Sequence, residues 1–144
     1  MKKIRIILLG LGVLFAFSNC KKDENEDHDH DHDHDVESKV MNVIIDTPTE
    51  DQMFGLNDVV TISGTVSGNF DLHGYEIKLF NESNNDSLMY ESFTHGHSES
   101  IDFSETWTNT VSDHSDVRVE VSALANHEGI ERETETVLIH CHPM

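Results

Sequence analysis

The sequence predicts an all-β protein whose strands form an antiparallel β-sandwich. From residue 40 onward the chain consists of short runs of Val, Ile, Thr, Leu and aromatic residues, in which apolar and polar positions alternate. Clusters of Gly, Asn, Asp and Ser separate these runs, which recur roughly every 8–14 residues, a spacing typical of sandwiches. No stretch has the apolar periodicity of a helix of ten residues.

We expect about seven strands, at residues 40–46, 58–66, 74–81, 87–93, 99–105, 117–125 and 132–140. Thr47-Pro48 ends the first strand, and the alternation is clearest in the third, fifth and sixth. The predicted core is Ile44, Val60, Ile62, Ile77, Leu79, Phe103, Trp107, Val119, Val121, Val137 and Ile139.

Two segments resemble bacterial immunoglobulin-like domains. Residues 47–51 (TPTED) followed by residues 57–68 (NDVVTISGTVSG) resemble their first two strands, and residues 119–129 (VEVSALANHEG) resemble their sixth strand with the turn after it. The resemblance covers residues 40–140 and implies an immunoglobulin-like domain over 40–144, of the kind found in small lipoproteins of Gram-negative bacteria. It implies no catalytic residue.

Residues 1–19 have the pattern of a secretory signal peptide, with a basic start followed by an apolar run too short to span a bilayer permanently. Cys20 follows directly and resembles the cysteine that carries covalent lipid in bacterial lipoproteins. The alternative is an ordinary signal peptide with an incidental cysteine. With the acidic residues 23–27, the lipoprotein resemblance implies an anchor in the outer membrane, on its periplasmic or cell-surface face.

The charge of the chain favours cations as partners. It has 28 Asp and Glu against 9 Lys and Arg, a formal net charge of −19, together with 11 His. Nucleic acids are excluded because a polyanion needs a basic surface.

Residues 20–39 are expected to be a disordered acidic tether, because they contain too few apolar residues to offset the entropy of ordering. Within the tether, four His-Asp repeats span residues 28–35. Imidazole binds Zn, Cu and Ni, and the adjacent carboxylates attract divalent ions. The candidate ligands here are His28, His30, His32 and His34. The alternative is a solvated acidic spacer.

Further histidines are expected to meet at one end of the sandwich. Loops alternate between the two ends in seven antiparallel strands, so the second, fourth and sixth connections share an end. These connections carry His73, His95, His97 and His127. Exposed polar residues at loop tips are the alternative interpretation.

The opposite end is expected to carry a second group. His114 lies in the fifth connection, and the chain ends with His140, Cys141 and His142 before Pro143 and Met144. Imidazoles and a thiolate form a plausible tetrahedral set for Zn or Cu. If the last strand continues, however, Cys141 faces away from His140 and His142 and packs inward.

These features predict a lipid-anchored extracytoplasmic protein that scavenges, buffers or delivers divalent transition-metal ions, with an outer-membrane receptor or importer as its partner. The metal is Zn, Cu or Ni. The alternative is an interaction module for protein or glycan, such as an accessory subunit or adhesin. No enzyme is expected, because no catalytic motif is found.

Overall fold

A computed structural model describes residues 38–143, and the regular secondary structure of these residues is almost entirely strand. One 3-10 turn, η1 (Glu82–Asn84), interrupts them, and no helix among these residues is long and apolar enough to cross a membrane. The strands are β1 (Met41–Thr47), β2 (Gln52–Phe54), β3 (Val59–Asn81), β4 (Ser87–Thr108), β5 (Ser115–Leu124) and β6 (Arg132–Cys141).

The strands β3 and β4 are each continuous where the sequence predicts two strands and a loop. They pair antiparallel along their whole lengths, from Val59 opposite Thr108 to Asn81 opposite Ser87. The predicted loops at the bend are replaced by shifts of register, of which the largest lies between Ser67 and Leu72. Extra residues in one strand bend it sharply without ending the hydrogen-bonded ladder. The two strands therefore pass from one layer of the sandwich to the other.

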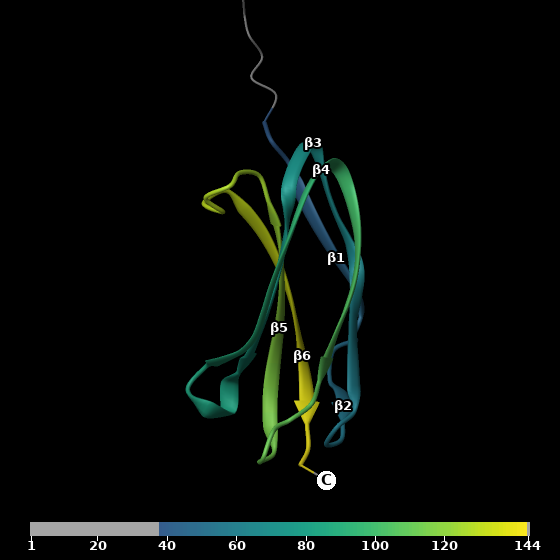
Figure 1. The fold of residues 1–144 in the computed structure, drawn as a ribbon, viewed down its shortest axis with the longest axis vertical. Helices are drawn as coiled ribbons and strands as arrows, with labels where there is room; N and C mark the ends of the chain where they lie inside the picture. The colour runs from purple at the N-terminus through teal and green to yellow at the C-terminus, as the bar shows by residue number, and fades with distance from the viewer. Residues whose placement is uncertain (1–37, 144) are drawn as a thin grey trace, which may run out of the picture. The chain divides into compact units, whose positions relative to one another are not determined.

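This passage produces two layers (Figure 1). In one layer β1 pairs with the first part of β3, and the last part of β4 pairs with the same part of β3. In the other layer the second part of β3 lies between the start of β4 and β5, and β5 pairs with β6. This is the strand order of an immunoglobulin-like sandwich, so the predicted fold class is confirmed.

The short strand β2 is absent from the sequence prediction. It pairs in parallel with β6, and the Asp51 amide donates to the Leu138 carbonyl while the His142 amide donates to the Phe54 carbonyl. Three residues, of which two are exposed, are too few to show alternation. The pairing places residues 50–58 beside the end of the chain.

The core lies between the two layers, and most of the predicted core residues are there. Ile44 is an error of the prediction, because its side chain is 52% exposed, whereas Val43 is only 8% exposed. Successive residues of a strand point to opposite faces, so an error of one position exchanges the buried and exposed sets. Val137 is only partly buried and packs against the core.

The two ends of the sandwich carry different segments. At one end lie the bends of β3 and β4, the start of β1 and the loop between β5 and β6 (Figure 1). At the other end lie β2, η1, the loop between β4 and β5, and the last described residues. The histidines of the domain are divided between these two ends.

Candidate functional site

An irregularity in the β3–β4 ladder positions His73. Leu72 is opposite Ser98 and Gly74 is opposite His95, so one residue of β3 faces two residues of β4. Gly74 has a φ of +132°, and a Cβ there would lie 2.0 Å from the Thr94 carbonyl oxygen. Only glycine fits at that position without strain. The irregularity leaves His73 opposite Gly96 and His97 of β4.

Two histidines of β4 meet His73 there. His95 and His97 are two residues apart in the strand, so their side chains leave the same face of the sheet. The ring centroids lie 4.4 Å apart for His73 and His95, 5.4 Å for His73 and His97, and 4.6 Å for His95 and His97. One ring nitrogen from each of the three lies within 4.8 Å of the others. These three residues are called the imidazole cluster below.

His127 approaches the cluster from the loop between β5 and β6. The loop is closed by a turn in which the Gly129 amide donates to the Asn126 carbonyl, and Gly129 has a φ of +60°. His127 Nδ1 lies 3.0 Å from His73 Nε2, and the two rings are nearly perpendicular. The two nitrogens therefore share one proton in a hydrogen bond.

The surroundings keep His73 in its neutral form. Partial burial lowers the pKa of His73 below its usual 6.5, and the three neighbouring imidazoles lower it further, whereas the carboxylate of Glu128 raises it. Only a neutral imidazole has a free lone pair for a metal ion. His73 is half-buried, and the other three histidines are exposed.

The four histidines lie together, as the alternation of connections predicts. The reason differs in part from the predicted one, because His73, His95 and His97 lie in the continuous strands β3 and β4 and not in loops. Sequence reasoning missed the bulge that aligns His73 with two residues of β4. The only local indication of the bulge in the sequence was the glycine at position 74. Metal binding by these residues stays a prediction.

At the opposite end, His114 and His142 lie side by side, with ring centroids 4.3 Å apart and planes inclined by 25°. They are stacked face to face. Among residues 38–143, the imidazole cluster is the only group of three or more His, Cys, Asp and Glu side chains arranged to hold one ion. The second predicted metal set is therefore not assembled here.

His140 is engaged by carboxylates at both ring nitrogens. Its Nδ1 lies 2.7 Å from an oxygen of Asp116, and its Nε2 lies 3.2 Å from an oxygen of Asp51. These hydrogen bonds, first the one with Asp116, raise the pKa of His140 above 6.5. With a carboxylate oxygen near each ring nitrogen, His140 links Asp116 of β5 to Asp51 beside β2, and its role as a metal ligand stays a prediction.

Cys141 packs into the core, which corrects its prediction as a metal ligand. Its side chain is fully buried among core residues, on the face of β6 opposite to His140. Burial raises the pKa of the thiol to about 11. A thiol in this position stays protonated at neutral pH, whereas a metal binds the thiolate. The inward packing that the sequence leaves open is the one observed.

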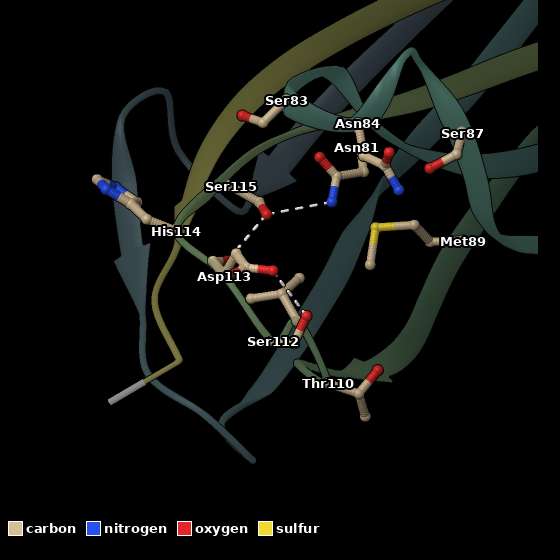
Figure 2. Close-up of a pocket in the computed structure, with 11 residues that line it drawn as sticks. Asn81, Ser83, Asn84, Ser87, Met89, Thr110, Ser112, Asp113, His114 and Ser115 are labelled. Atoms are coloured by element: carbon tan, nitrogen blue, oxygen red, sulfur yellow. Dashed lines mark hydrogen bonds between the residues drawn. The ribbon is translucent and has the colours of Figure 1, made fainter.

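A polar pocket of about 570 Å³ lies near His114, between the η1 segment and the loop from β4 to β5 (Figure 2). Asn81 Nδ2 donates to Ser115 Oγ, and the buried Oδ1 of Asn81 has no hydrogen-bond partner. Met89 and Asp113 also line the pocket, and its lining includes no Lys or Arg. Sequence reasoning missed it, because its polar residues come from segments that carry no motif.

The surface around these sites has little free positive charge. All four Lys and Arg of residues 38–143 contact carboxylates: Lys39 contacts Glu131, Lys78 and Arg132 contact Glu76, and Arg118 contacts Glu82, Asp86 and Glu120. The chain as a whole has three times as many acidic as basic residues. The remaining carboxylates therefore attract cations.

Several predicted sites lie outside the described residues. These are the signal peptide, the lipidation site Cys20 and the tether ligands His28, His30, His32 and His34.

The sequence matches no protein-family model and none of the curated proteins with which it was compared. Its structure is similar to the fibronectin(III)-like modules of CbhA from Clostridium thermocellum, with a TM-score of 0.47 and 16% sequence identity. That match covers 72% of this chain and 98% of the module chain.

Proposed function

We propose that the domain binds one divalent transition-metal ion at the imidazole cluster of His73, His95 and His97. The observation that carries this proposal is the convergence of three ring nitrogens within 4.8 Å of one another. In tetrahedral coordination at about 2.05 Å from zinc, neighbouring nitrogens lie about 3.4 Å apart. Side-chain rotations that move the nitrogens by up to about 1.5 Å would complete the geometry.

The donor atoms favour Zn²⁺, Cu²⁺ or Ni²⁺ as the ion. Imidazole nitrogen is a ligand of intermediate softness that these ions prefer, whereas Mg²⁺ and Ca²⁺ prefer oxygen. No sulfur atom belongs to the cluster, so nothing in it favours Cu(I). The lowered pKa of His73 keeps one ligand deprotonated at neutral pH.

In the cell, we propose a lipid-anchored protein of the outer membrane that scavenges, buffers or delivers this ion to a receptor or importer. Supporting features are the signal-like residues 1–19, the adjacent Cys20 and the His-Asp repeat at 28–35, which would supply weaker additional sites. Cys20→Ser should prevent acylation and release the protein from the membrane fraction. Unchanged membrane fractionation and detergent partitioning would contradict the anchor.

Isothermal titration calorimetry with Zn²⁺, Cu²⁺ and Ni²⁺ tests the metal site. The proposal predicts one site tighter than the rest, whose affinity falls at least tenfold when His95 and His97 are replaced by Ala. A chain without residues 28–35 should keep this tight site and bind fewer ions in total. Because protons compete for imidazole, binding should weaken as the pH falls below about 6.5.

The matched control is His114→Ala, which removes an exposed imidazole at the opposite end of the sandwich. This variant should keep the tight site. Equal losses in the control and in the double variant of His95 and His97 would show that histidines bind the ion without a defined centre. Loss of all binding on removal of residues 28–35 would assign the metal to the tether alone.

A second candidate function is an interaction module, and the polar pocket favours it. Hydroxyl and amide side chains around a 570 Å³ cavity could hydrogen-bond the hydroxyl groups of a glycan or a partner's loop. If neither histidine replacement changes metal binding, this candidate replaces the first. Ser112→Trp would then be expected to block the pocket and abolish binding of the partner.

A further inference from the structure

Strand β4 runs along a free edge of the sandwich. Among the described strands, β1, β2 and β4 each pair with a single neighbour, and their lengths are 7, 3 and 22 residues. The backbone N–H and C=O groups on the unpaired side of a strand can form hydrogen bonds with another extended chain. Within residues 38–143, β4 therefore has the longest free edge.

Residues 100–108 are the regular part of that edge. They lie opposite residues 59–67 of β3 in unbroken register, from Ser100 opposite Ser67 to Thr108 opposite Val59. The register shifts of the β3–β4 pairing all lie in the rest of β4. A stretch without bulges can take up an added strand along its whole length, whereas a bulge disrupts such pairing.

The side chains of this stretch alternate between solvent and the core. Phe103 and Trp107 are buried in the core. Glu105 lies on the same side of the strand, where its carboxylate accepts hydrogen bonds from the hydroxyls of two tyrosines, Tyr75 and Tyr90. The outward side chains are exposed, and they are Ser100, Asp102, Ser104, Thr106 and Thr108.

Negative charge protects this edge from pairing with a second copy of the chain. Free edges are commonly protected by Lys or Pro, but β4 contains no Lys, Arg or Pro. Its carboxylates here are Glu99, Asp102 and Glu105, and none of the three forms an ion pair with a Lys or Arg of residues 38–143. Because the chain has a net charge of −19, they repel a second copy and attract a basic segment.

We propose that residues 100–108 of β4 bind an extended basic segment of a partner protein as an additional strand. Backbone hydrogen bonds along the edge supply affinity, and a Lys or Arg opposite Asp102 supplies specificity. Apolar residues at the alternate positions of the segment face the core side of the sheet. This interaction is independent of the proposed metal site, because it uses no residue of the imidazole cluster.

A peptide of alternating lysine and valine, equal in length to residues 100–108, tests the proposal. It is titrated into the full chain at low salt, and NMR follows the hydrogen exchange of the backbone amides. We expect saturable binding, with slower exchange of the amides in residues 100–108 that face the free edge. A peptide with glutamate in place of lysine should not bind, and high salt should weaken binding of the lysine peptide because it screens the charges.

Asp102→Lys and Asp46→Lys form a matched pair of variants. Each replaces an exposed carboxylate by an ammonium group, and Asp46 belongs to β1 at the opposite edge of the same layer. Asp102→Lys should weaken binding of the lysine peptide by roughly threefold or more, whereas Asp46→Lys should change it by less than about twofold. Asp102→Asn keeps an acceptor for the hydroxyl of Thr65 and should give an intermediate loss.

Several results would contradict this proposal. Equal losses in Asp102→Lys and Asp46→Lys would show attraction to the acidic chain as a whole, without a defined edge. Peptide binding without slower exchange in residues 100–108 would exclude strand addition, and equal binding of the glutamate peptide would exclude recognition of basic charge. Exchange that slows as the concentration of the chain rises, without any peptide, would assign the edge to a second copy.

Discussion

Replacing Asn109 should destabilise the end of the sandwich at which the chain finishes. This side chain is completely buried after β4, and its Nδ2 donates to the carbonyls of Gly55 at 2.9 Å and of Phe54 and His142 at 3.3 Å. Its Oδ1 accepts from the Val111 amide at 3.1 Å. One amide group thus joins the segment after β2, the segment after β6 and its own loop.

Asn109→Ala should lower the free energy of unfolding by about 3–4 kcal/mol. About two net hydrogen bonds are lost at about 1 kcal/mol each, and a buried amide or carbonyl left without a partner costs about a further 1–2 kcal/mol. Urea unfolding followed by the fluorescence of Trp107, the single tryptophan, measures the change.

Asn109→Asp has nearly the same shape and provides the control. It keeps an acceptor for Val111 but places a carboxylate oxygen against three carbonyl oxygens. Burial raises the pKa of such a carboxyl in the folded state, so this variant should be less stable than Asn109→Ala at pH 7 and recover as the pH falls below that raised pKa. A loss under about 1 kcal/mol in Asn109→Ala, or a pH-independent Asp variant, would refute this account.

Three further predictions concern other residues. NMR titration should give His140 a pKa above 6.5, and Asp116→Asn should lower that pKa. The ion pairs of His140 stabilise the fold below pH 6.5, and this stabilisation is lost as the pH rises through the raised pKa. An unshifted His140 pKa would contradict these ion pairs. The Cys141 thiol, with a pKa of about 11, should resist thiol reagents at pH 8 until urea unfolds the chain, whereas rapid native labelling would place it outside the core. Gly74→Ala should lower both Tm and metal affinity, because its Cβ would lie 2.0 Å from a backbone oxygen. The matched control is Gly55→Ala, whose Cβ would have its nearest atom at 3.3 Å. Equal losses of Tm and metal affinity in the two variants would contradict the role of the bulge.

The candidate site was predictable in its membership but not in its geometry. Alternation of connections was enough to bring His73 and His127 to one end, since neighbouring antiparallel strands reverse direction. It could not show that His73 Nε2 contacts His127 Nδ1, because the two residues are 54 positions apart in the sequence. Neither could it show that His140 contacts Asp51, since Asp51 is 89 residues away in the sequence.

The sequence by itself determined the fold class, the acidic charge and the inward face of most strands, because side-chain alternation is a local property of extended backbone. Only the tertiary structure decided the register of β3 against β4, the pairing of β2 with β6 and the burial of Cys141. These depend on contacts between segments far apart in the chain. Ile44 shows where the prediction from alternation failed: Met41, Val43 and Ile45 form the inward face of β1, and Ile44 lies between Asn42 and Asp46 on the exposed face.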